Sequence, residues 1–296
     1  MQCVEFYCER SFMSSLVFEN IGQIDLRAVF NCGQCFRWTE EANGIYSGVA
    51  GGRFVRVRAE DGVLWIDGAR QEDRAFWYTY FDLDRDYEAI KQQLTGIDRF
   101  LDCAIAFGGG LRILNQEFFE TVISFILSAN NNIPRIRGCV EQAAVYYGRD
   151  LGGHFAFPDC RQLCSATEEE LSERLHAGYR CRYIVHTCRQ LRENPVTVKA
   201  LQAMSLQGAR RALCSYMGVG NKVADCILLF TGARQDVFPV DVWVKRIMEE
   251  LYFKRTASVK EVDAFAAEHF GKMRGFAQQY LFYYAREHME ELRNMI

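Results

Sequence analysis

Hydrophobic and polar residues follow two different periods along this chain. Between residues 44 and 68 there are six glycines, and two runs of alternating β-forming residues, 54–58 and 63–66, lie among them. The dipeptides Gly51-Gly52 and Asp61-Gly62 precede these two runs. Alternation that is bounded by such turn signals predicts hairpins in an antiparallel sheet.

From residue 87 onward the hydrophobic period is that of a helix. One apolar face is formed by Phe118, Val122, Phe125 and Ile126. Similar patterns predict further helices at 133–147, 167–175, 182–192, 206–216, 222–230, 242–251, 259–270 and 276–295. Strands followed by helices, without strand–helix alternation, describe an α+β fold. We therefore expect an antiparallel sheet-rich domain at residues 13–110 and an all-helical domain at residues 111–296, with the glycine triplet 108–110 as the boundary.

Composition places the chain among ordinary globular proteins. Of its 296 residues 49% are hydrophobic and 25% are charged, and its apolar runs are far shorter than the roughly 20 residues that a membrane span needs. The first dozen residues include Glu5, Glu9 and Arg10 and offer no apolar core of a secretory signal. We expect an intracellular protein without a membrane partner, and both Met1 and Met13 stay open as its start.

The charge and the cysteines change this picture little. Lys and Arg number 35 against 38 Asp and Glu, so net charge alone does not favour nucleic acid as a partner, although a local stripe or a ring of backbone amides can bind phosphate. Twelve cysteines without a secretory signal indicate reduced thiols. Cys32 and Cys35 form one CxxC, but no second pair follows at zinc spacing. We expect buried thiols, no metal and no cofactor.

The segment from residue 213 to residue 241 carries the candidate chemistry. It contains Gly218-Val219-Gly220 between two predicted helices, with Asn221 as a plausible N-cap of the second. Two glycines permit positive φ and close backbone approach, and the amides of such a turn suit one phosphate. A tight corner between two helices explains the same pattern, so both interpretations stay open.

Two charged side chains follow this turn. Lys222 falls in the first turn of the second helix, where the helix dipole disfavours a cation and favours the neutral amine, which can form a Schiff base with a sugar carbon. Asp241 follows Pro239 and can act as the N-cap of the next helix. The same carboxylate, held ionised by helix amides, can also stabilise a positive sugar-like transition state.

Five segments together carry a family resemblance. They are Gly33-Gln-Cys-Phe-Arg-Trp38, residues 124–135 with three consecutive asparagines, Gly178-Tyr-Arg-Cys-Arg-Tyr183, the stretch 218–241, and residues 275–282. In this order they resemble the helix-hairpin-helix, Gly/Pro-rich, Asp superfamily of DNA glycosylases, and within it the eukaryotic type of 8-oxoguanine DNA glycosylase. The resemblance implies a helix-hairpin-helix at about 206–230 and a C-terminal helix that packs back near the N-terminal domain.

The resemblance implies a bifunctional glycosylase and lyase. Lys222 attacks C1′ of the damaged nucleotide, expels the base and leaves an imine that permits strand scission by β-elimination. Asp241 stabilises the developing oxocarbenium charge. Gly33 offers its carbonyl to the N7–H that 8-oxoguanine has and guanine lacks. Gln278 reads the Watson–Crick edge of the flipped base, while Phe282 and Cys226 sandwich its ring.

The partner implied is double-stranded DNA that contains 8-oxoguanine opposite cytosine. Asn130 fills the gap in the duplex, Arg135 and Arg180 bond the orphaned cytosine, and Tyr179 wedges the kinked stack. Gly218, Val219 and Gly220 form the phosphate-binding hairpin. We further expect a monomer in a reducing interior that holds DNA, which is the cytoplasm with its nucleoid in a bacterium and the nucleus in a eukaryote.

The chain departs from the family at one position that matters. A histidine two residues after the catalytic aspartate contacts a phosphate in the family, and Trp243 stands there in this chain. No four-cysteine cluster follows Asp241, unlike relatives that hold an iron–sulfur cluster. Two alternatives remain, a non-catalytic module that binds damaged DNA and a glycosylase for another oxidised purine. Lys222 with Asp241 argues against the first, and Gly33 with Gln278 argues against the second.

Overall fold

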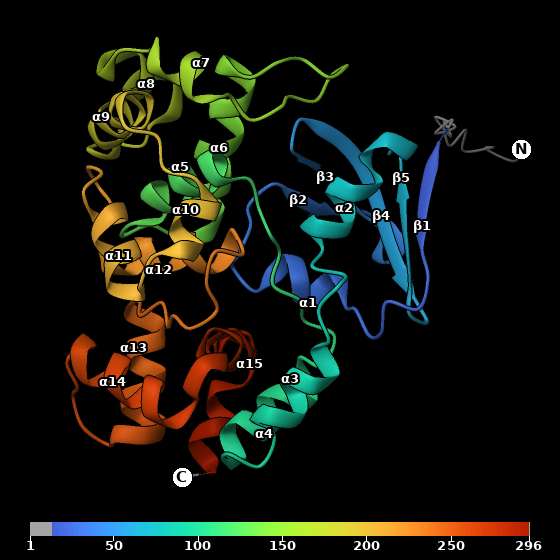
Figure 1. The fold of residues 1–296 in the computed structure, drawn as a ribbon, viewed down its shortest axis with the longest axis vertical. Helices are drawn as coiled ribbons and strands as arrows, with labels where there is room; N and C mark the ends of the chain where they lie inside the picture. The colour runs from blue at the N-terminus through green and yellow to red at the C-terminus, as the bar shows by residue number, and fades with distance from the viewer. Residues whose placement is uncertain (1–13, 296) are drawn as a thin grey trace, which may run out of the picture.

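The N-terminal part is built on one antiparallel sheet. The computed structural model describes residues 14–295, and the possible start at Met13 lies outside them. The five strands are paired in the order β1-β5-β4-β3-β2 (Figure 1). Their bounds are β1 Ser15–Phe18, β2 Trp38–Glu40, β3 Tyr46–Ala50, β4 Arg53–Glu60 and β5 Val63–Asp67.

Two tight turns fix this sheet. Gly51 and Gly52 connect β3 to β4, and Asp61 and Gly62 connect β4 to β5, with positive φ at all four residues. Positive φ at both central residues is what a type I′ hairpin turn requires, because its twist matches that of the flanking strands. Both predicted hairpins are therefore confirmed. Strands β4 and β5 are each longer than the runs 54–58 and 63–66 that the sequence pattern indicated.

Several short elements of this part were not predicted. They are β1, β2, α1 (Leu26–Asn31) and α2 (Arg74–Tyr80). Each is too short for its own period to be read. The two strands depend on pairing with β5 and β3, and the two helices share the core of the sheet. Trp38 shows this best, because its ring stacks on Phe30 at 4.3 Å and its indole N–H donates to the hydroxyl of Tyr80 at 2.8 Å.

The rest of the chain is helical, as predicted. The helices are α3 Tyr87–Leu94, α4 Arg99–Phe107, α5 Phe118–Ser128, α6 Ile133–Tyr147, α7 Cys160–Cys164, α8 Glu168–Leu175, α9 Arg180–Glu193, α10 Val198–Ala203, α11 Leu206–Cys214, α12 Asn221–Phe230, α13 Val242–Met248, α14 Val259–His269 and α15 Arg274–Asn294. The helix predicted at 242–251 ends earlier, and a π-helical turn, Glu249–Phe253, continues it. The α+β fold class is confirmed.

The glycine triplet 108–110 lies in a close contact between two chain segments. A Cβ on Gly110 would lie 2.5 Å from the backbone nitrogen of Asp25, and that nitrogen donates to the Gly110 carbonyl at 2.8 Å. Helices α3 and α4 precede the triplet, yet their buried residues belong to the core of the helical part and they lie beside α15 (Figure 1). The domain boundary at this triplet stays a prediction.

Several hydrogen bonds join the N-terminal part to the rest of the chain, and those of Arg286 and Gln34 fix the loop after α1. Arg286 on α15 donates to the carbonyl of Asn31 at 2.7 Å. The buried amide of Gln34 donates to the carbonyls of Val29 and Arg112, both at 2.8 Å, and its oxygen accepts from the Leu114 N–H. The loop after α1 is thereby fixed against the helical part.

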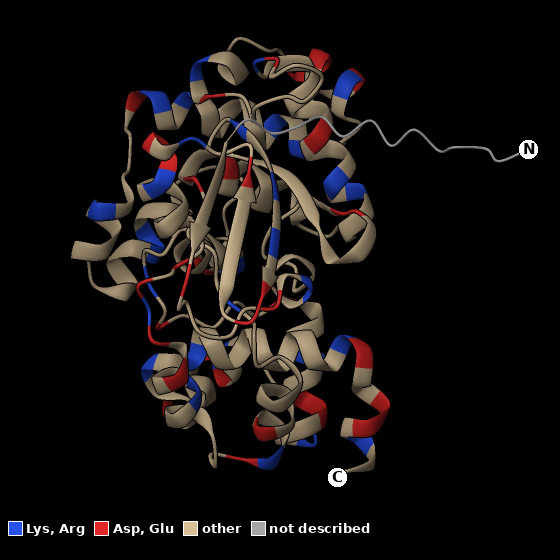
Figure 2. Cartoon of the chain, turned by 90° about the vertical axis from the view of Figure 1, so that its right-hand side faces the viewer, with Lys and Arg blue, Asp and Glu red and all other residues tan. Residues whose placement is uncertain are grey.

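Charge and thiols add two observations. Acidic and basic residues are mixed over the face that carries the sheet (Figure 2). Within residues 14–295 no helix is both long and apolar enough to cross a membrane. The described cysteines are free, with Cys32 and Cys35 buried, and that part of the chain holds no cluster of three or more His, Cys, Asp or Glu suited to a metal ion.

Candidate active site

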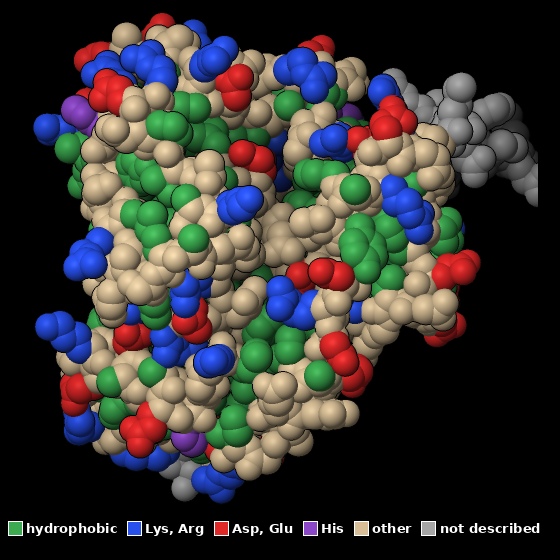
Figure 3. Space-filling view, viewed as in Figure 1, with side chains coloured by type: hydrophobic (Ala, Val, Ile, Leu, Met, Phe, Trp, Pro, Cys, Tyr) green, Lys and Arg blue, Asp and Glu red, His purple; other side chains and the backbone are tan. Residues whose placement is uncertain are grey.

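A cavity of about 370 Å³ lies where the end of α5 meets the starts of α12 and α13. The loop after α1 and the middle of α15 close it from the other side. In the space-filling view a recess separates the helical part from the sheet-bearing part (Figure 3). The cavity is lined by Gly33, Phe36, Phe125, Ser128, Asn131, Asn132, Ile133, Pro134, Ile136, Lys222, Asp241, Trp243, Phe282 and Arg286.

Lys222 enters this cavity from the first turn of α12. Its Nζ donates to the hydroxyl of Ser128 at 3.2 Å and lies 5.3 Å from the ring centroid of Phe125. The helix begins at Asn221 and its N-cap is Gly220, without a side-chain cap. The prediction that Asn221 is the N-cap is therefore wrong, and no side chain caps the first amides of α12.

Asp241 lies at the start of α13 and lines the same cavity. Its carboxylate accepts from the backbone N–H of Val244 at 2.8 Å, which confirms the predicted N-cap. A capping carboxylate is held in one orientation by the helix amides, so the structural role and the catalytic role are compatible here. Trp243, two residues on, is 55% exposed and also lines the cavity.

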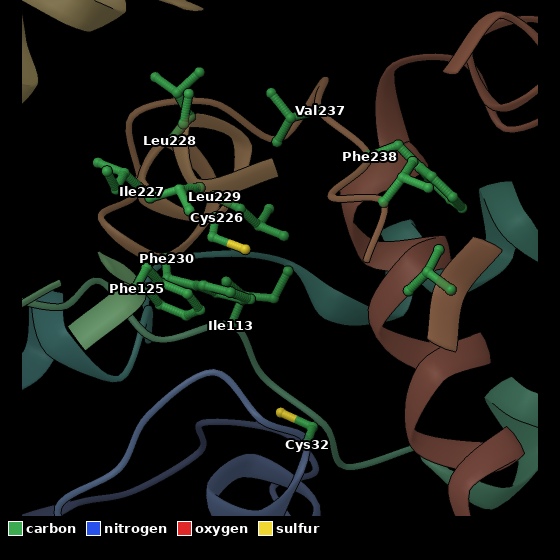
Figure 4. Packing of buried hydrophobic residues seen from close by; sticks show 14 of the residues in the cluster. Cys32, Ile113, Phe125, Cys226, Ile227, Leu228, Leu229, Phe230, Val237 and Phe238 are labelled. Carbon is green, nitrogen blue, oxygen red and sulfur yellow. The ribbon is translucent and has the colours of Figure 1, made fainter. Parts of the chain in front are cut away.

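Cys226 lies one helical turn after Lys222 and is buried beside the cavity. Burial raises the pKa of its thiol to about 12, while the Lys222 amine opposes the rise and the Asp241 carboxylate adds to it. The thiol is therefore neutral next to the Lys222 amine and the Asp241 carboxylate. Figure 4 shows Cys226 above the rings of Phe125 and Phe230, which stack at 5.2 Å.

Gly33 and Phe282 form the opposite wall. Gly33 has φ of +81°, and a Cβ there would lie 3.2 Å from Cε1 of Phe282. Only glycine fits this close approach without strain. Gln278 lies one turn before Phe282 on α15 and is buried, and its amide oxygen accepts from Gln279 at 2.7 Å. Gln278 and Cys226 thus lie beside the cavity and are not part of its lining.

The three consecutive asparagines have different environments. Asn131 donates to the carbonyl of Leu127 at the end of α5, and Asn132 accepts from the Arg135 N–H as N-cap of α6, each at 3.0 Å. Asn130 is exposed and has φ of +49°. Two of the three side chains therefore hold helix ends, and the third projects from the surface.

Arg180, the first residue of α9, holds the loop that carries Asn130. Its buried guanidinium donates to the carbonyls of Ala129, Asn130 and Ala177 over 2.5–3.1 Å. Tyr179 beside it is 52% exposed. Arg135 is exposed and donates to the carbonyl of His176 at 3.0 Å. Of the two arginines predicted to bond cytosine, Arg135 therefore has the accessible guanidinium.

The hairpin between α11 and α12 is supported by α9. Thr187 donates to the carbonyl of Met217 at 2.6 Å, and Gln190 accepts from the Met217 N–H at 2.9 Å. Gly218 has φ of +83° and Gly220 has φ of −91°. The amide of Val219 donates within the hairpin, to the Tyr216 carbonyl at 3.1 Å, so the amides available to a phosphate are those of its neighbours.

A buried ion pair locks the two helices of this hairpin. Arg210 on α11 donates to both carboxylate oxygens of Asp225 on α12, at 2.7 and 2.8 Å, and to Asp263 on α14 at 3.0 Å. Two parallel hydrogen bonds fix the relative orientation of planar groups. The start of α12, and Lys222 with it, is held in place by this contact.

Comparison with known proteins agrees with this geometry. The family model for the N-terminal domain of 8-oxoguanine DNA glycosylase matches residues 16–122, and that for the HhH-GPD superfamily of base excision DNA repair proteins matches residues 123–272. A probable N-glycosylase/DNA lyase of Methanothermobacter thermautotrophicus is 32% identical over 259 residues, which are 78% of this chain and 82% of that protein. The chain belongs to the 8-oxoguanine DNA glycosylases.

Two further relatives match most of the length of this glycosylase. The N-glycosylase/DNA lyase OGG1 of Arabidopsis thaliana is 29% identical over 283 residues, covering 88% of this chain and 77% of that protein. The 8-oxoguanine glycosylase/lyase of Clostridium acetobutylicum, solved in complex with double-stranded DNA containing cytosine opposite 8-oxoG, has a TM-score of 0.87 at 38% identity. The alignment covers 94% of this chain and 97% of that one.

The glycosylase's cavity brings together five of the residues singled out from its sequence: Gly33, Lys222, Asp241, Trp243 and Phe282. Ser128, Phe125 and Arg286 are among the lining residues to which the sequence assigned no role. Ser128 and Phe125 lie inside a segment that resembles the family, but helical spacing marks Phe125 as a core residue, and nothing in the local sequence shows that a side chain 94 positions away reaches Ser128.

Proposed function

We propose that this glycosylase flips 8-oxoguanine opposite cytosine out of double-stranded DNA, excises it, and cleaves the strand at the resulting abasic site. The observation that carries the proposal is the single cavity that holds the Lys222 amine, the Asp241 carboxylate and the Gly33–Phe282 wall. The activities printed for the relatives, N-glycosylase/DNA lyase and 8-oxoguanine glycosylase/lyase, support it.

The chemistry follows from the Lys222 amine and the Asp241 carboxylate. The lone pair of Lys222 Nζ forms a bond to C1′ while the C1′–N9 bond breaks. The base leaves with the electron pair of the C1′–N9 bond and takes up a proton. Asp241 stabilises the positive charge on the sugar during this step. Ring opening, with proton transfer from nitrogen to O4′, gives the imine. Loss of a C2′ proton then expels the 3′ phosphate by β-elimination.

Recognition of the base uses the opposite wall of the cavity. The Gly33 carbonyl accepts from the N7–H of 8-oxoguanine, whereas the N7 of guanine would face it as a second acceptor. Phe282 stacks on one face of the base and the neutral Cys226 thiol covers the other. Gln278 reads the Watson–Crick edge after it releases its contact with Gln279.

Recognition of the duplex uses the surface around the cavity. Asn130 projects into the space that the flipped base leaves, Tyr179 wedges the stack, and Arg135 bonds the orphaned cytosine, while Arg180 holds the loop that carries Asn130. The hairpin Gly218-Val219-Gly220 and the uncapped start of α12 bind one backbone phosphate. The enzyme acts as a monomer in a reducing interior that holds DNA, in the cytoplasm with its nucleoid in a bacterium or in the nucleus in a eukaryote.

Borohydride trapping tests the proposal directly. We expect a covalent protein–DNA adduct on a duplex with one 8-oxoguanine opposite cytosine, and none on undamaged DNA. Lys222→Gln should abolish both excision and the adduct while lesion binding persists. Lys199→Gln, an exposed change near the start of α10, is the matched control and should trap normally.

The other outcomes separate the alternatives. Excision by Lys222→Gln near the wild-type rate would overturn the assigned nucleophile. Adducts with a different oxidised purine would keep the mechanism and change the substrate. Tight lesion binding with neither excision nor an adduct in the wild type would instead support a non-catalytic damaged-DNA-binding module.

A further inference from the structure

Ser128, at the end of α5, makes two hydrogen bonds beside the first turn of α12. Its hydroxyl donates to the carbonyl of Phe125 at 2.8 Å, and its oxygen accepts from Lys222 Nζ at 3.2 Å. A serine hydroxyl has one proton and two lone pairs. Because the proton is already directed at the Phe125 carbonyl, the oxygen faces Lys222 purely as an acceptor.

This arrangement matters for a nucleophilic amine. A hydroxyl that rotates freely can donate to the lone pair of a neutral amine and occupy the electrons needed for attack. Here the backbone carbonyl prevents that. We propose that Ser128 is a positioning residue that accepts one N–H of Lys222 and so turns the amine's lone pair into the cavity. The inference rests on the proposed role of Lys222 as nucleophile.

The surroundings make Ser128 a rigid reference point. It is the last residue of α5, and the ring of Phe125, one turn earlier, stacks on Phe230 at the far end of α12. Helices α5 and α12 are therefore joined by the stacked rings of Phe125 and Phe230 as well as by the hydrogen bond between Ser128 and Lys222. The lysine side chain has four rotatable methylenes, so a fixed acceptor removes conformers that point the amine away from the sugar.

The test compares Ser128→Ala with the wild type in single-turnover excision, borohydride trapping on a preformed abasic site, and lesion binding. We expect excision and trapping to fall together by about tenfold in Ser128→Ala, with the dissociation constant for the lesion duplex unchanged. Ser128→Thr should restore both rates, because threonine also bonds back to a helix carbonyl. Ser124→Ala, a buried serine one turn earlier on α5, is the control.

Several outcomes would overturn the inference. They are Ser128→Ala at the wild-type rate, no rescue by threonine, or equal losses in Ser124→Ala. A merely structural role would lower lesion binding and thermal stability together with the rates. The proposed function fails separately: if Lys222→Gln still forms the adduct, Lys222 is not the nucleophile, whatever Ser128→Ala does.

Discussion

Gly218 and Gly220 flank the same residue of the hairpin but differ in what an added methyl group meets. Gly218 has φ of +83°, and a Cβ there would lie 2.7 Å from Cβ of Tyr183 on α9. Gly220 has φ of −91°, and a Cβ there would have no heavy atom of the described chain within 4 Å. Gly218→Ala and Gly220→Ala therefore form a matched pair.

The expected cost at Gly218 has two parts. The left-handed conformation costs an alanine about 1–2 kcal/mol. Overlap with Tyr183, which belongs to a helix packed in the core, adds about 1–3 kcal/mol as overpacking. The free energy of unfolding should thus fall by about 2–5 kcal/mol. At Gly220 the change should be neutral or stabilising by up to about 1 kcal/mol, because alanine restricts the unfolded chain.

Urea unfolding, followed by tryptophan fluorescence, and binding to a lesion duplex together test this pair. Gly218→Ala should lose stability. Gly220→Ala should keep its stability and lose DNA affinity, because its methyl group would stand where we propose that the first amides of α12 bind a phosphate. A Gly218→Ala protein within 0.5 kcal/mol of wild type, the resolution expected of the measurement, would refute the strain argument. Unchanged binding in Gly220→Ala would refute the proposed phosphate site.

Two further predictions concern titration and the opposite base. Burial raises the pKa of Glu120 to about 7 against the pull of Arg37, so its contribution to stability is present below pH 4.5 and is lost as pH rises through about 7. Glu120→Gln should flatten this dependence in thermal melts at pH 5 and pH 8, and an unchanged profile would contradict it. Arg135→Ala should weaken the preference for cytosine opposite the lesion by about 1–3 kcal/mol, measured as excision rates against the four opposite bases. An unaltered opposite-base profile would exclude this contact.

The sequence predicts those features that depend on local chemistry. Positive φ at Asp61 and Gly62 follows from the identity of the turn residues, and the cap at Asp241 follows from a polar side chain before a helix. The short strand β2 escaped prediction, because it exists only through its pairing with β3. The contact between Ser128 and Lys222 was likewise not predicted, because no local sequence pattern shows which helix ends meet in the fold.

At the start of helix α9 the structure differs from the role that the sequence motif predicted for Arg180. The segment 178–183 resembles a DNA-reading motif, and the exposed Tyr179 keeps that interpretation open. Arg180, however, donates to the carbonyls of Ala129 and Asn130, and farther along the same helix Thr187 holds the hairpin at Met217. One rigid helix therefore positions both the loop proposed to fill the duplex and the hairpin proposed to bind its backbone. A displacement of α9 would move both contacts together, so mutations on its buried face should alter lesion binding without touching DNA.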